Sequence, residues 1–192
     1  MDKPVEIRHG PYTIKAGILH GAATARAFVT GGKAGVVAQT TGDSLEEAIG
    51  TLKSDLDGRD AAERSHRRHD PALGFDVPTE KEYLQALQIV KPHDGHLRML
   101  RAQALAGEKG LTAKELAFDA GYHDAAAANL QYGLVGREIA AAIGCGLPKT
   151  GIQGDLDLAT GVLGSAGPAR PDGQWPWVMH PELRAAVVGY VA

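Results

Sequence analysis

The stretch LTAKELAFDAGYHDAAAANLQYGLVGREIAAAIG (residues 111–144) decides the fold expected for the second half of the chain. Thr112 and Glu115 have the spacing of a capping box, in which each side chain bonds a free backbone amide at a helix start. Gly121 is expected to end this short helix, because glycine tolerates positive φ, and Asp124 to cap a longer helix. Two helices joined by a glycine turn predict a helix-turn-helix.

Helical patterns also precede this stretch, and a hairpin pattern follows it. Thr79 with Glu82 opens one helix, which Pro92 stops, and Asp94 is expected to cap the next. Residues 151–164 and 174–180 alternate in part between apolar and polar types, which predicts a β-hairpin with a long tip in the position of a wing. The pattern therefore favours a winged-helix-like domain over residues 79–192.

Two tryptophans and a proline complete the predictions for this end of the chain. Trp175 and Trp177 are expected to share one strand face and to cover the helical core. Pro181 suits the first turn of a final short helix.

The first 57 residues predict a separate unit, a small antiparallel sheet with one helix. Ser44 and Glu47 mark the helix start. Lys15, Arg26 and Lys33 are either ordinary solvated residues or cations on a sheet face that enters a nucleic-acid groove. The expected strands cover residues 5–8, 13–19, 24–29 and 35–40. Residues 58–78 mix charges and prolines without a sustained apolar period and predict a linker with a helical beginning, so the expected fold class is α+β.

The amino-acid composition is that of an ordinary globular protein. Of 192 residues, 44% are hydrophobic and 22% charged, and the net charge of -3 gives no direct sign of a nucleic-acid partner. The single cysteine, Cys145, excludes an intramolecular disulfide and favours a reducing compartment. No apolar run approaches the roughly 20 residues of a membrane span, and the charged start lacks a signal-peptide core. We expect a cytoplasmic protein with no membrane partner.

The helix-turn-helix offers side chains that can recognise DNA bases. Asn and Gln pair with adenine, Arg pairs with guanine, and neighbouring cations contact phosphates. The arginines of the predicted linker could rest against the phosphate backbone. The expected DNA-binding residues are Lys114, His123, Asn129, Gln131, Arg137, Arg64, Arg67 and Arg68. The alternative is a protein-binding adaptor or regulator that uses the same helices.

The sequence pattern T-A-x-x-L-A-x-x-x-G-Y followed by A-x-N-x-x-Y-G-x-x-G, together with the ending WVMHPELRAAV, resembles a module of bacterial restriction and HNH-endonuclease-associated proteins. The resemblance covers residues 79–192 and implies a winged-helix module appended to a nuclease or reading domain, in a bacterial or phage restriction, defence or mobile-element setting. The chain lacks the His-Asn-His hairpin and paired CxxC motifs of such nucleases. Recognition, not cleavage, is what the resemblance carries over. Its most specific positions are Gly121, Tyr122, Asn129, Tyr132, Gly133 and Gly136.

Histidine clusters give the third hypothesis, a metal-dependent nuclease. The segments SHRRHD and PHDGH place His66, His69, His93 and His96 beside aspartates, residue types that bind divalent metals. Their spacing matches no established metal motif, and the arginines around His66 disfavour a cation. TGGKAG lacks the spacing of a phosphate-binding loop, and no nucleophile motif is present. We therefore expect no catalytic residue, metal or cofactor.

Overall fold

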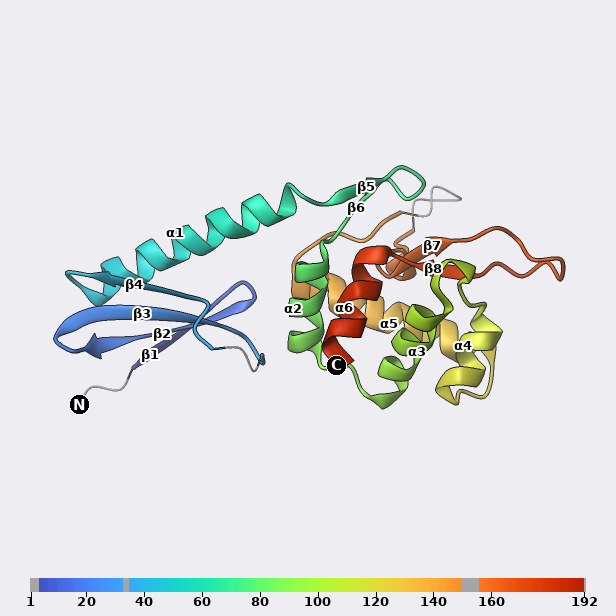
Figure 1. The fold of residues 1–192 in the computed structure, drawn as a ribbon, viewed down its shortest axis with the longest axis horizontal. Coiled ribbons are helices and arrows are strands. Elements are labelled where there is room, and N and C mark those ends of the chain that lie inside the picture. The colour runs from blue at the N-terminus through green and yellow to red at the C-terminus, as the bar shows by residue number, and fades with distance from the viewer. Residues whose placement is uncertain (1–3, 33–34, 150–155, 192) are drawn as a thin grey trace. The chain divides into compact units, whose positions relative to one another are not determined.

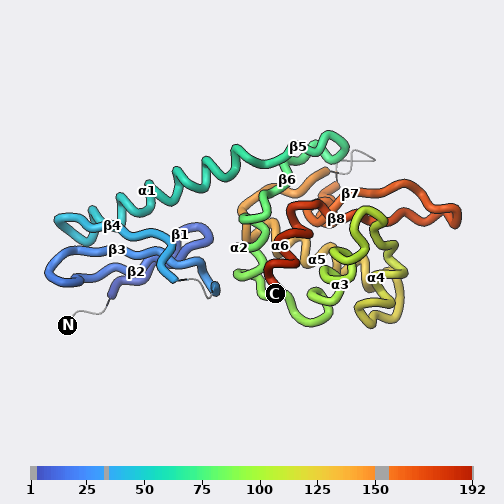
Figure 2. Tube along the Cα trace, viewed as in Figure 1, coloured from blue at the N-terminus to red at the C-terminus, as the bar shows by residue number. Residues whose placement is uncertain are grey.

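A computed structural model describes residues 4–32, 35–149 and 156–191, which form six α-helices and three antiparallel sheets (Figures 1 and 2). The predicted α+β class is confirmed. The chain divides into two compact units, Met1–His66 and Arg67–Ala192. None of the helices in the described ranges is long and apolar enough to cross a bilayer.

The first unit is a four-stranded antiparallel meander covered by one helix (Figure 1). Apolar side chains alternate along the strands, so that Ile14, Ala25 and Ala27 lie on one face and pack against Leu52 and Leu56 of the helix. The predicted sheet with one helix is confirmed. Its elements are β1 (Val5–His9), β2 (Tyr12–Leu19), β3 (Ala22–Val29), β4 (Ala38–Gly42) and α1 (Leu45–Arg64).

Residues 58–78 have the predicted helical beginning, but the remainder is a hairpin instead of the predicted linker. Helix α1 continues through Gly58 to Arg64, because one exposed glycine costs only about 1 kcal/mol in a helix interior. Strands β5 (Arg68–Asp70) and β6 (Phe75–Val77) then form a hairpin. Phe75 and Val77 are buried in the core of the second unit. These two apolar residues alternate with one polar residue, a pattern in the sequence that is typical of a strand.

The second unit buries one continuous core between its helices. Tyr83, Met99, Leu116, Tyr132 and Leu183 come from five helices and are all inaccessible to solvent. Its remaining elements are α2 (Glu80–Val90), α3 (Asp94–Ala106), the 3-10 turn η1 (Gly107–Lys109), α4 (Ala113–Ala120), α5 (Ala125–Ile143), the 3-10 turn η2 (Ala159–Val162), β7 (Gly164–Ala166), β8 (Trp177–Met179) and α6 (Pro181–Val191).

Most of the predicted helix ends are confirmed. Complete capping boxes open α2 at Thr79 and α4 at Thr112. The capping box at the start of α1 is partial. The Ser44 hydroxyl accepts from the Glu47 amide, but the Glu47 carboxylate accepts from the amide of Asp43 and not from that of Ser44. The prediction of Asp94 as the α3 cap is wrong. His93 takes that position, because its ring Nδ1 accepts from two backbone amides of the first turn.

The C-terminal hairpin is shorter than predicted. β7 pairs with β8, whereas residues 159–162 of the expected first strand form η2 and residues 150–155 lie outside the described residues. Trp177 is half-buried in β8, but Trp175 is 62% exposed and precedes the strand. Pro176 lies between them and cannot donate a ladder hydrogen bond, so the expected shared strand face does not form.

Helix α5 packs against α2, α4 and η2. Its closest contact is at Gly136, where a Cβ atom would overlap the carbonyl of Ala159. Gly133 lies one turn earlier and has no neighbouring atom at its Cβ position. The two glycines of α5 therefore serve different purposes.

We expect Gly136→Ala to lower the free energy of unfolding by about 1–3 kcal/mol, because the added methyl group forces α5 away from η2. Gly133→Ala should raise it by about 0.5–1 kcal/mol, since alanine is the better helix former. Urea unfolding followed by circular dichroism measures both. Equal changes in the two variants would contradict the close approach at Gly136.

Candidate nucleic-acid interface

The junction between α4 and α5 is a short turn over residues 121–124. Gly121 adopts φ 76° and ends α4, and the Tyr122 amide donates to the Ala117 carbonyl at 2.8 Å. Arg98 of α3 donates two hydrogen bonds to the Ala120 carbonyl, which ties the end of α4 to α3. Asp124 then caps α5 by accepting from the Ala127 amide at 2.8 Å. Hydrogen bonds therefore hold the turn both at the end of α4 and at the start of α5.

The exposed side of α5 brings two of the predicted DNA-binding residues together. Asn129 and Arg137 line one shallow groove of about 260 Å³. Leu130 and Leu134 lie between them and are 62% and 41% exposed. The groove's other wall is formed by residues 157–160. This side of α5 thus offers an amide, a guanidinium and two leucines.

Gln131, also predicted to contact DNA, faces the interior instead. Its amide oxygen accepts from His96 Nε2 at 3.0 Å. His96 is buried on α3, and burial is the main cause that lowers its pKa. Gln131 therefore joins α5 to α3.

The two other predicted contacts near the turn are solvent-exposed. Lys114 lies on α4 beside Phe118 and lines a separate hollow with it. The Phe118 ring is 86% exposed. His123 lies exposed in the turn itself. Both polar side chains remain available to a partner.

The predicted phosphate-contacting arginines differ in their surroundings. Arg64 is exposed at the end of α1. Arg67 donates two hydrogen bonds to Glu82, at 2.9 and 2.6 Å, and both side chains are only about an eighth exposed. Arg68 pairs with Glu182 at 2.8 Å. Hydrogen bonds to these carboxylates raise the pKa of both Arg67 and Arg68. Arg67 and Arg68 hold the β5–β6 hairpin to α2 and α6.

The histidine clusters do not form a metal site within the described ranges, where no group of three or more metal-binding side chains occurs. His69 pairs with Asp76 at 2.8 Å, while His66 is exposed. His93 caps α3 and stacks on His96, with ring centroids 3.7 Å apart. Each of these contacts has a structural explanation.

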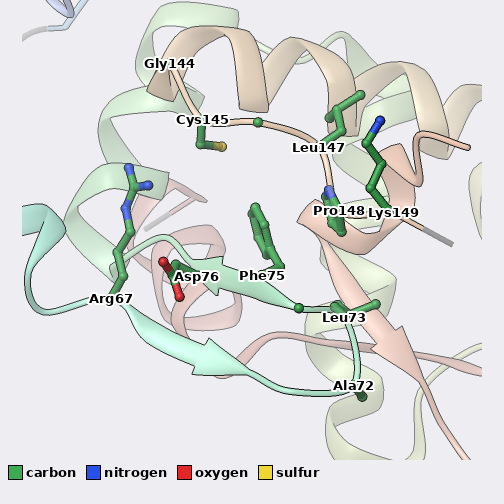
Figure 3. A pocket seen from close by; sticks show the side chains of 12 residues that line it. Arg67, Ala72, Leu73, Phe75, Asp76, Gly144, Cys145, Leu147, Pro148 and Lys149 are labelled. Atoms are coloured by element: carbon green, nitrogen blue, oxygen red, sulfur yellow. The ribbon is translucent and has the colours of Figure 1, made fainter. Parts of the chain in front are cut away.

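A larger cleft, of about 620 Å³, lies between the β5–β6 hairpin and the loop after α5 (Figure 3). Its wall includes Arg67, Phe75, Asp76 and Cys145. Burial raises the pKa of the Cys145 thiol, which keeps it protonated and unreactive. Arg67 is bonded to Glu82, and Asp76 to His69.

No family model, characterised protein or solved structure matches this chain.

His180 is a buried polar group beside Arg68. Its Nε2 lies 3.0 Å from the Gly161 carbonyl, which can only accept, so the proton is on Nε2. Its Nδ1 faces an Arg68 nitrogen at 3.5 Å. Burial lowers the pKa of His180 below 6.5, and the folded protein holds the ring neutral.

We expect acidification to destabilise the protein through His180. Below pH 6.5 the unfolded chain binds the imidazole proton before the folded chain does, so the free energy of unfolding falls as pH falls. His180→Gln keeps an amide donor for Gly161 and removes this titration, so its stability should fall less between about pH 7 and 5. His66→Gln, on the surface, is the control. A slope unchanged by His180→Gln would refute this assignment.

Proposed function

We propose that this chain is a non-catalytic DNA-binding protein that reads duplex DNA through α5. The observation that carries the proposal is that α4 and α5 are joined by a turn at Gly121, with Asn129 and Arg137 lining one exposed groove. Eight residues separate these two side chains, or about 12 Å along the helix. That length spans three or four stacked base pairs at about 3.4 Å each. An asparagine suits adenine and an arginine suits guanine.

The start of α5 supports close approach to a groove. Its first turn is made of alanines, and Ala126 is exposed. Short side chains let the backbone approach base edges, while the Asp124 carboxylate occupies the first-turn amide of Ala127. We propose that α4 and α5 belong to a winged-helix-like unit in which β7 and β8 supply the wing.

Electrostatics make base contacts more important than phosphate contacts here. Asp157 lines the groove itself, Glu138 follows Arg137, and Asp119 and Asp124 are exposed on α4 and in the turn. Only Arg137 and Lys114 carry positive charge on the outer sides of α4 and α5. Sequence-independent affinity depends on neutralised phosphates and is therefore weak for this surface. We propose a sequence-specific protein of the bacterial or phage cytoplasm, in a restriction, defence or mobile-element setting.

A protein partner is the second candidate. Leu130 and Leu134 are exposed at adjacent turns of α5, a spacing that suits packing against another helix. In the DNA proposal the same leucines contact thymine methyl groups.

The first test selects bound sequences from a random duplex pool and measures the enriched duplex by fluorescence anisotropy. Asn129→Ala with Arg137→Ala should weaken binding by about tenfold or more, because each lost base contact is worth about 1–3 kcal/mol. Arg101→Ala removes an equal charge from an exposed site on α3 and should have little effect.

Failure to enrich any duplex at low salt would overturn the DNA proposal.

The double variant Leu130→Ser with Leu134→Ser tests the second candidate. A protein partner that the wild-type chain captures and only this variant fails to capture would identify the two leucines as the contact.

A second prediction concerns the carboxylates. Glu138→Gln with Asp119→Asn should tighten duplex binding at low salt, because both exposed charges repel phosphate. The gain should shrink as salt rises, since the Debye length is about 10 Å at 0.1 M. An affinity that is unchanged at low salt would place α4 and α5 away from the DNA.

A further inference from the structure

The sheet of the first unit has one face without a helix of its own unit. Because side chains alternate across each strand, the residues opposite the α1-packed face are fixed by the register. Lys15 pairs with Arg26, and Thr13 pairs with Phe28. Arg8 lies beside Thr13 on the neighbouring strand, on the same face. The open face thus gathers three cations and one aromatic ring.

Charge is segregated between the two sides of this unit. The only cations within β1–β4 are Arg8, Lys15 and Arg26, and the only carboxylate is Glu6. Helix α1, on the opposite side, carries six carboxylates and three cations. The open face is therefore the positive side of the unit, although the whole chain is acidic. Lys33, also predicted to face a groove, lies outside the described residues.

The ring on this face is positioned among the cations. Phe28 is half-buried, and the Lys15 ammonium lies 6.0 Å from its ring centroid. Arg26 is held by Gln39, whose amide oxygen accepts from the guanidinium Nε at 2.7 Å. That bond leaves the remaining guanidinium nitrogens for other acceptors. Glu6 lies on the same face, opposite Lys15, so the face carries three cations and one carboxylate.

We propose that the open face of the β1–β4 sheet binds single-stranded nucleic acid. Phe28 stacks on an unpaired base, while Arg8, Lys15 and Arg26 contact phosphates. A duplex is the poorer occupant, because its base faces are already stacked and leave nothing for Phe28. This surface goes beyond duplex reading by α5, since it belongs to the other unit and recognises a different form of nucleic acid.

The test uses the full chain and a fluorescent oligothymidylate of about 20 nucleotides, longer than the site sizes typical of such surfaces. Lys15→Gln with Arg26→Gln should weaken binding about tenfold at about 50 mM salt. It should also reduce the slope of log affinity against log salt by about 1.4, or about 0.7 for each lost phosphate contact. Lys53→Gln with Arg59→Gln changes the net charge equally on α1 and is the matched control.

Two further variants separate stacking from charge. Phe28→Leu should weaken binding about fivefold with the salt slope unchanged, because it removes a stacking ring and no cation. Glu6→Gln should strengthen binding, since Glu6 lies 3.4 Å from the Lys15 ammonium and competes for it. A gain of affinity cannot arise from misfolding.

The proposal is overturned if the wild-type chain does not bind the single strand, or if the control pair on α1 weakens binding as much as the sheet pair. Equal affinity for the single strand and its duplex, with no effect of Phe28→Leu, also overturns it. The Asn129→Ala, Arg137→Ala variant should retain single-strand binding. Failure here is thereby distinguished from failure of duplex reading by α5.

Discussion

The second unit depends on how closely α5 can approach the turn η2. At Gly136 the backbone of the helix meets the Ala159 carbonyl, and no side chain fits between them. This contact fixes α5 at a depth where Tyr132, Val135 and Ile139 are buried and the opposite side remains exposed. Protein interiors are so densely packed that adding or removing a single methyl group changes their stability. Ala159 also lines the groove beside Asn129, so this contact sets the distance between the two walls of the groove.

Local rules explain which features the sequence could predict. Capping boxes at Thr79 and Thr112 and the end of α4 at Gly121 depend only on residues within one turn. The direction of Gln131 depends on His96, which is 35 residues away on α3. The pairing of Arg67 with Glu82 is likewise a tertiary contact. The sequence therefore predicts which residue types can contact a partner, but the direction of each side chain depends on how the helices pack.

Net charge is a poor guide to what this chain can bind. A charge acts over about a Debye length, so a partner responds to the side chains it faces and not to the sum over the protein. The sheet separates its cations from the carboxylates of α1 because the strand register assigns each residue to one side. The helical unit lacks such separation, and Arg137 has Glu138 as its neighbour. Two surfaces of one acidic protein thus differ in electrostatic character, one mainly positive and the other mixed.

The alanine-rich first turn of α5 determines which substitutions this part of the helix tolerates. Ala128 faces the core, whereas Ala126 faces solvent and contributes little to packing. Substitutions at exposed positions of this kind usually alter stability by less than about 0.5 kcal/mol. A longer side chain at Ala126 would reach whatever the helix contacts while the core stayed intact. Position 126 can therefore accept new side chains by single substitutions, without any compensating change elsewhere in the fold.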